Sequence, residues 1–188
     1  MGTQRVLVLA GPNGAGKTTM SRALVRDEFG IEDFVNADFI AQGLVGFAPE
    51  RAAVAAGRLL LHRIRELAAA GSEFAFETTL ASRTFAPWFR SLQRRGYEVL
   101  LVFVWVPSPE LSISRVAMRV AAGGHHVPEA IIRRRFQRSI ANFHRLYLPV
   151  VDRWWCYDNR LPAPRLVARG VQGHAEVLVP ETWQEVCR

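Results

Sequence analysis

The chain has little cysteine, a single lysine and no long apolar run, and each absence excludes a class of protein. Cys156 and Cys187 are too few for a disulfide framework or a cysteine-ligated metal site. No apolar run approaches the roughly 20 residues that span a bilayer. The N-terminal apolar run, Val6 to Ala10, leads straight into a glycine-rich stretch, which is not the pattern of a signal peptide. We therefore expect a cytoplasmic protein with no membrane association.

Charge and composition are those of a globular, basic protein. The 188 residues include 24 Lys+Arg and 17 Asp+Glu, a formal net charge of +7, with 49% hydrophobic and 22% charged residues. A basic chain can bind nucleic acid, but these arginines are spread along the sequence and bind any anion, nucleotide phosphates included. Nucleic acid is therefore not the partner we expect first. The length predicts one domain over residues 1–188.

The one lysine, Lys17, lies in a stretch that fits G-x-x-x-x-G-K-[ST] at every fixed position. A buried strand is predicted before it, from Val6 to Ala10, and a helix after it, from Thr18 to Arg26. In that geometry backbone N–H groups and the helix N-terminus converge on one anion. The pattern predicts ATP binding, with Lys17 at the β/γ-phosphates and the Thr18 hydroxyl as the Mg²⁺ ligand. The residues predicted to hold ATP are Gly11, Pro12, Asn13, Gly14, Ala15, Gly16, Lys17, Thr18 and Thr19.

Apolar strands alternate with helical segments along the rest of the chain. The predicted strands are 34–36, 74–76, 98–106 and 154–157, followed by two short strands at 165–168 and 175–179. The predicted helices are 49–70, 87–95, 110–121, 128–148 and a short one at the C-terminus, and a loop is expected through Gly43 and Gly46. This alternation predicts an α/β, three-layer P-loop NTPase fold, with a mainly parallel sheet and helices on both faces.

Two carboxylates, Asp38 and Glu77, follow predicted strands and should share the sheet edge of the phosphate loop. Asp38 is expected to orient and deprotonate an acceptor hydroxyl or to hold Mg²⁺ through water; the alternative is a helix N-cap. Glu77 is expected to contact an acceptor hydroxyl or hydrated Mg²⁺; the alternative is a structural bond to a neighbouring loop. Thr79 and Arg83 form part of a polar turn that could contact the acceptor. Residues 158–169 are the segment in which we expect contacts with adenine.

The predicted strand 98–106 ends without the carboxylate that motor-type ATPases place there, which favours a small-molecule kinase. Arginines then flank a hinge at Gly123 and Gly124, as in a helical lid over about residues 115–138. Arg119 and Arg134 are the first candidates to reach a transferring phosphoryl group, with Arg135 beside them; the alternative is a solvated basic face. His125 and His126 are expected on the lid surface or at the substrate, without a metal.

Four segments together resemble the zeta-toxin-like family of P-loop kinases, in the branch often labelled "predicted ABC-type ATPase". They are residues 11–19, Asn36 to Asp38, Glu77 to Arg83 and Gly123 to Arg135. The resemblance implies transfer of phosphate from ATP, with Mg²⁺, to a hydroxyl of UDP-N-acetylglucosamine. It implies that Asp38 is the base, Lys17 the Walker lysine and Glu77 an acid on the substrate side. It also implies phosphate-stabilising roles for Arg119 and for Arg134 or Arg135.

The chain departs from the family where the segments face the acceptor. Asn36-Ala-Asp38 replaces an Asp-x-Asp type segment, and Glu77-Thr-Thr replaces Glu-Gly-Thr. We therefore expect an ATP- and Mg²⁺-dependent phosphotransferase whose acceptor is UDP-N-acetylglucosamine or a related nucleotide sugar, with an antitoxin protein as a candidate partner. The alternatives are a kinase of another metabolite, such as a sugar or nucleoside, and a nucleotide-dependent switch or ATPase associated with nucleic acid.

Overall fold

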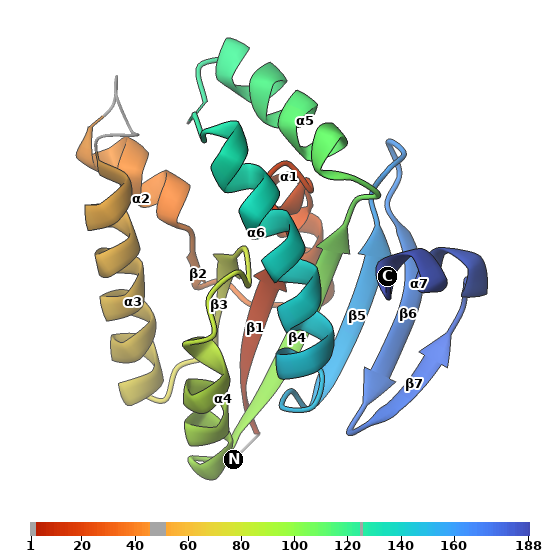
Figure 1. Ribbon diagram of the computed structural model, residues 1–188. Helices are drawn as coiled ribbons and strands as arrows, with labels where there is room; N and C mark the ends of the chain where they lie inside the picture. Colours follow the sequence, from red (N-terminus) through yellow and green to blue (C-terminus); the bar gives the residue numbers. More distant parts are fainter. Residues whose placement is uncertain (1–2, 46–51, 125) are drawn as a thin grey trace.

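The computed structural model describes residues 3–45, 52–124 and 126–188, and its centre is one seven-stranded sheet in the order β2-β3-β1-β4-β5-β6-β7 (Figure 1). The strands are β1 Gln4–Ala10, β2 Phe34–Val35, β3 Phe74–Thr78, β4 Tyr97–Trp105, β5 Arg153–Asp158, β6 Arg165–Val171 and β7 His174–Val177. The first five strands of that order are parallel, and β6 and β7 are antiparallel to their neighbours.

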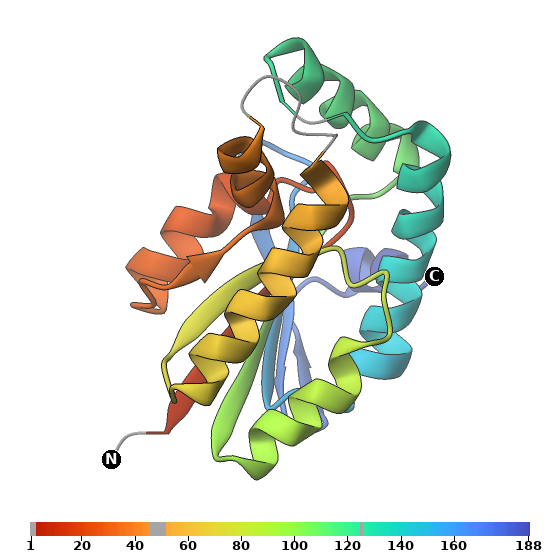
Figure 2. The ribbon, with the colours of Figure 1, turned by 90° about the vertical axis from the view of Figure 1, so that its left-hand side faces the viewer.

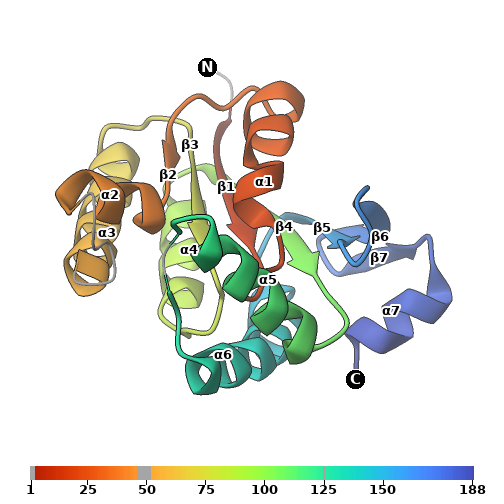
Figure 3. The same cartoon turned by 90° about the horizontal axis from the view of Figure 1, so that it is seen from above.

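Helices cover both faces of this sheet. They are α1 Lys17–Ser21 with its π-helical continuation η1 Arg22–Glu28, α2 Ala37–Leu44, α3 Ala53–Ala69, α4 Phe85–Arg94, α5 Pro109–Ala121, α6 Glu129–Asn142 with its continuation η3 Phe143–Tyr147, and α7 Pro180–Val186. Seen from above, α1 lies on one face while α4, α6 and α7 lie on the other (Figure 3). Helix α5 lies beyond the carboxyl ends of β1 and β4 (Figures 1 and 2). The three-layer α/β prediction is confirmed.

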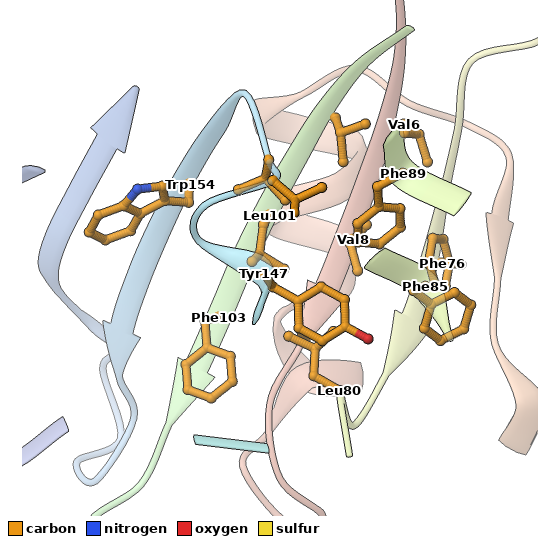
Figure 4. Packing of buried hydrophobic residues seen from close by; sticks show 14 of the residues in the cluster. Val6, Val8, Phe76, Leu80, Phe85, Phe89, Leu101, Phe103, Tyr147 and Trp154 are labelled. Atoms are coloured by element: carbon orange, nitrogen blue, oxygen red, sulfur yellow. The ribbon is translucent and has the colours of Figure 1, made fainter. Parts of the chain in front are cut away.

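The strands at the centre form because their side chains are apolar on both faces. Residues Val6 to Ala10 of β1 are fully buried, and β4 pairs along β1 on one side and β5 on the other. Alternate residues point to opposite faces: Val6 and Val8 join the core beneath α4 and η3, and Leu7 and Leu9 join the core beneath α1 and η1. Figure 4 shows the first of these cores, in which aromatic rings from β3, α4 and η3 meet. The rigid sheet therefore fixes the edge at which β1 and β3 end.

Some predicted segments differ from the observed ones. The loop expected through Gly43 is instead helix α2, because Asn36 caps its first turn. The helix expected over 128–148 leaves α-helical geometry at Phe143, and the first helix does so at Arg22. Gly46 and the predicted helix start at Pro49 lie outside the described residues. None of the described helices is both long and apolar enough to cross a membrane.

Candidate active site

A cavity of about 1040 Å³ opens at the carboxyl edge of the parallel strands, where ligands of open α/β sheets bind. Its walls come from the phosphate loop, α2 and α3, the β3–α4 loop, α5 and α6, and the chain after β5. The lining includes Asn13, Gly14, Gly16, Lys17, Thr18, Thr19, Asp38, Glu77, Thr79, Arg119 and Arg135 among the predicted site residues. Segments that are far apart in sequence therefore meet at one cleft.

The phosphate loop holds a shape that side chains at its glycines would prevent. Gly11 and Gly14 have positive φ angles of 141° and 72°. A Cβ on Gly11 would lie 2.1 Å from the Val104 carbonyl oxygen, and one on Gly14 would lie 2.4 Å from the Ser112 carbonyl oxygen. The loop is thus pressed against the end of β4 and the first turn of α5. Such a cradle fits a polyphosphate, because backbone N–H groups can approach it closely.

Asn159, just after β5, supports the other end of the loop. Its Nδ2 donates to the Ala15 carbonyl at 2.7 Å, and a Cβ on Gly16 would lie 2.3 Å from the same nitrogen. The predicted adenine segment also reaches the cleft, since Asn159, Leu161, Pro162 and Pro164 line it. No sequence motif identified the contact of Asn159 with the loop.

Lys17 is buried inside the loop. Its Nζ donates to the carbonyl oxygens of Gly11 and Pro12, each at 2.9 Å, and lies 3.6 Å from Oε1 of Glu77. Burial lowers the pKa of Lys17, and the Glu77 carboxylate opposes that shift. An ammonium in this position fits the β/γ-phosphates of ATP, whose oxygens would replace the two carbonyls as acceptors.

Glu77, at the end of β3, joins the phosphate loop to α2. Its Oε2 accepts hydrogen bonds from the Thr18 hydroxyl at 2.8 Å and from Asn36 Nδ2 at 2.7 Å. The Thr18 oxygen, donating its proton to a carboxylate, keeps its lone pairs for a cation, and hard oxygen ligands suit Mg²⁺. The Glu77 side chain is only 13% exposed, and this carboxylate lies beside Thr18, the predicted metal ligand.

Asp38 lies in the first turn of α2, but it is not the N-cap. Asn36 has that position: its Oδ1 accepts from the backbone N–H of Asp38 at 2.7 Å and of Phe39 at 3.4 Å. The Asp38 side chain is 40% exposed and its Oδ2 lies 3.5 Å from Nη1 of Arg119 on α5. The capping alternative for Asp38 is therefore wrong, and its carboxylate lines the cleft.

The arginines of α5 and α6 divide into those at the cleft and those outside it. Arg115, Arg119 and Arg135 line the cleft, whereas Arg134 is exposed and is not among the lining residues. Burial and the neighbouring Arg134 lower the pKa of Arg135, and Asp38 opposes this. The Arg115 guanidinium donates to the carbonyl oxygens of Asn159 and Arg160 at 2.8 and 3.3 Å, which ties α5 to the chain after β5.

The β3–α4 loop brings hydroxyl groups to the cleft: Thr79, Ser82 and Thr84 line it, while Arg83 is exposed and does not. Leu80 within this loop is fully buried at a positive φ of 54°, an unfavourable conformation for a branched side chain. Asn142 of α6 donates to the Leu80 carbonyl at 2.7 Å and helps to hold it there. The loop is therefore fixed against the helix that carries Arg135.

Both glycines of the predicted lid hinge, Gly123 and Gly124, are described, whereas His125 directly after them lies outside the described residues. Gly123 has a positive φ of 86°, and apolar contacts among Val116, Val127 and Ile132 join α5 to α6. The two helices thus pack against each other, and residues of both line the cleft.

Comparisons with known proteins agree with this architecture. A family model described as "AAA domain" matches residues 6–146. An uncharacterized protein of Haemophilus influenzae (strain ATCC 51907 / DSM 11121 / KW20 / Rd) is 25% identical over 132 residues, which is 70% of this chain and 92% of that protein.

Solved structures resemble the chain over nearly its whole length. The crystal structure of AvrRxo1-ORF1:-ORF2 with ATP has a TM-score of 0.78 at 16% identity, covering 98% of this chain but 64% of that one. The PezAT chromosomal toxin–antitoxin system of Streptococcus pneumoniae has a TM-score of 0.66 at 18% identity, with coverages of 97% and 77%. A gluconokinase from Sinorhizobium meliloti 1021 has a TM-score of 0.53 at 13% identity, with coverages of 98% and 90%. At these identities the likeness is one of fold, and the chain spans about two thirds of the first protein.

Proposed function

Since the chain belongs to the AAA-domain family and has the fold of P-loop kinases, we propose that it is an ATP- and Mg²⁺-dependent kinase that transfers the γ-phosphoryl group to a hydroxyl of a small molecule. Asp38 supports this proposal most strongly. It lines the same cleft as the phosphate loop, and its carboxylate does not cap α2, because Asn36 does. A phosphate-binding loop alone would serve any nucleotide-binding protein. A carboxylate opposite it can serve an acceptor hydroxyl.

The phosphate loop binds and orients the donor. Its backbone N–H groups and Lys17 would hold the β- and γ-phosphates, and the oxygens of Thr18 and Glu77 would hold Mg²⁺. When bound, Mg²⁺ supplies positive charge that neutralises the β- and γ-phosphate oxygens.

Asp38 orients the acceptor hydroxyl and accepts its proton at a carboxylate oxygen. In a loose phosphoryl-transfer transition state the proton can leave late, so the base need not remove it before transfer begins. Arg119 stabilises the charge that develops on the transferring group, with Arg135 on the next helix. Closure of α5 and α6 over the cleft would bring these guanidinium groups closer and exclude water. Arg134 would need such a movement to contribute, since it lies outside the cleft lining.

The acceptor binds between α3 and the β3–α4 loop, beside Asp38. This part of the wall combines the hydroxyls of Thr79, Ser82 and Thr84 with the apolar surface of Leu60 and Phe85. Such a surface suits a ring that has hydroxyl groups and one apolar face. We propose UDP-N-acetylglucosamine or a related nucleotide sugar as the first acceptor to test, with free sugars and nucleosides next.

An antitoxin-like protein is the partner we propose. Two of the similar structures support it: one is described as an ORF1:ORF2 complex and the other as part of a toxin–antitoxin system. Co-purification with the product of a neighbouring reading frame would test this, and a lone protein with full activity in its host would argue against it.

The direct test is incubation of the purified protein with γ-labelled ATP and Mg²⁺, with and without UDP-N-acetylglucosamine. Lys17→Ala is the control, because it removes the buried ammonium. Label on the sugar nucleotide, lost in the control, would establish both the reaction and the acceptor. Label released only as phosphate would support the donor site and direct the search to sugars and nucleosides. Absence of any Mg²⁺-dependent ATP binding would refute the proposal.

A further inference from the structure

Asn36 is a buried amide, 3% exposed, between the two carboxylates of the cleft. On one side its Nδ2 donates to Glu77 at 2.7 Å, and on the other its Oδ1 accepts from the backbone N–H of Asp38 at the same distance. Glu77 in turn accepts from Thr18 at 2.8 Å. A continuous series of hydrogen bonds therefore runs from the phosphate-loop helix, through the end of β3, to the first turn of α2.

An amide is the side chain that can make both of Asn36's contacts. A cap needs an acceptor directed at the N–H groups of α2, and Glu77 needs a donor. Aspartate supplies only acceptors and would place a second carboxylate against Glu77. Serine can cap, but its shorter hydroxyl cannot accept from the helix and also span the distance to the carboxylate. Alanine would leave the Glu77 oxygen and the α2 N–H groups short of partners in a buried setting.

We propose that Asn36 is a positioning residue that sets the base, Asp38, at a fixed distance from the Thr18–Glu77 pair. The inference rests on the proposed kinase function and deepens it. Asn36 itself lines the cleft, but we do not propose that it contacts the reacting atoms. Its effect passes through Asp38 on one side and through Glu77 on the other. Because β2 is only two residues long, Phe34–Val35, the strand alone holds the start of α2 weakly, and the amide supplies the missing attachment.

The kinetic test uses Asn36→Ser, which retains a capping oxygen but loses the donor to Glu77. We expect the KM for ATP to change by no more than about threefold and kcat to fall at least tenfold, since small misplacements of reacting groups cost up to about 10²-fold. Gln93→Ala is the matched control: that amide also donates to a carboxylate, Asp152, at 3.0 Å, but it lies on α4 away from the cleft. A kcat for Asn36→Ser within twofold of wild type would overturn the proposal. So would a kcat no lower than that of Gln93→Ala, if the two variants lose the same free energy of unfolding.

A second test needs no turnover and separates failure of this inference from failure of the kinase proposal. Asn36→Asp sets two carboxylates together, whereas Asn36→Asp combined with Glu77→Gln restores a donor and an acceptor with their positions exchanged. We expect the double variant to be more stable than the Asn36→Asp variant. In urea unfolding without nucleotide, its unfolding equilibrium constant should be at least tenfold lower. Additive effects of the two substitutions would show that the side chains are not coupled. If coupling is present but wild type phosphorylates no acceptor, the kinase proposal fails while the hydrogen-bonded series stands.

Discussion

Asp38→Asn tests the central step of the proposed reaction. The substitution keeps the size of the side chain and its position in the first turn of α2, and it removes both the charge and the proton-accepting oxygen pair. It leaves the cap of α2 untouched, because Asn36 supplies it. We expect phosphoryl transfer to fall at least 10²-fold while ATP affinity stays within about threefold of wild type, in keeping with the size of general-base effects.

The structure limits how much of that loss could come from unfolding. The Asp38–Arg119 pair is 3.5 Å apart, with side chains 40% and 37% exposed, so solvent screens it and it is worth about 0–1 kcal/mol. A carboxylate near a helix N-terminus adds about 0.3–1 kcal/mol. The loss of transfer, by contrast, corresponds to about 2.7 kcal/mol or more at the transition state. A destabilised protein alone therefore cannot account for the expected kinetics.

The assay is single-turnover transfer from γ-labelled ATP at saturating protein, paired with a binding titration of ATP. Asp33→Asn is the control, because Asp33 is also an exposed partner of an arginine, Arg63, at 3.8 Å, and lies before α2. It should transfer at the wild-type rate. Full activity in Asp38→Asn would refute the assignment of the base. An equal loss of ATP affinity would show instead that Asp38 serves the donor.

Three further outcomes follow from the geometry. Gly57→Leu, on the cleft face of α3 where a Cβ meets nothing within 4 Å, should raise the acceptor KM at least tenfold and leave ATP hydrolysis within threefold, with Gly57→Ala as the control. Gly14→Ala should abolish ATP binding in a calorimetric titration, because its methyl group would lie 2.4 Å from the Ser112 carbonyl oxygen. Burial lowers the pKa of His144, so the folded protein favours the neutral ring; its contribution is complete above about pH 6.5 and is lost as the pH falls below that value. Urea unfolding at pH 7.5 and 5.5 should show this loss, and His144→Phe should reduce it.

Much of the fold could be predicted, because the central strands and the phosphate loop can each be recognised within one short stretch of sequence. The strand from Val6 to Ala10 is apolar throughout, and β4 is apolar and buried from Val99 to Trp105, as expected of strands buried on both faces of a sheet. The glycines of the phosphate loop follow from the same stretch of sequence. The sequence predicts helix α2 only as the alternative in which Asp38 caps a short helix, because Gly43 favours a loop; the observed cap is Asn36. No local pattern marks the change to π-helical geometry at Phe143, whose ring stacks on Phe103 of the distant strand β4.

The candidate site could be predicted only where single segments carry the chemistry. Strand ends indicated that Asp38 and Glu77 share one edge, because parallel strands bring their carboxyl ends together. The sequence gives no sign that Glu77 contacts Thr18, or that Asn159 holds the loop at Ala15. Those contacts depend on the order of strands in the sheet, which places β3 and β4 on either side of β1. Arg134 and Arg135 are adjacent in sequence, and only the orientation of α6 tells which one lines the cleft.

The same reasoning explains why the donor is easier to identify than the acceptor. The proposed donor side lies mainly in the single segment 11–19, whereas the proposed acceptor side combines residues of α2, α3, the β3–α4 loop and α6. Among the described residues of this proposed acceptor side, Thr79, Ser82 and Thr84 bring hydroxyls, Leu60 and Phe85 bring apolar surface, and Arg135 brings a positive charge. A diphosphate of a nucleotide sugar would compete for Arg135 with the transferring phosphoryl group, whereas an uncharged sugar or nucleoside would not. Comparing UDP-N-acetylglucosamine with N-acetylglucosamine in wild type and in Arg135→Gln therefore separates the two acceptor classes: a loss confined to the nucleotide sugar would assign Arg135 to its diphosphate, and an equal loss for both would assign it to the phosphoryl group.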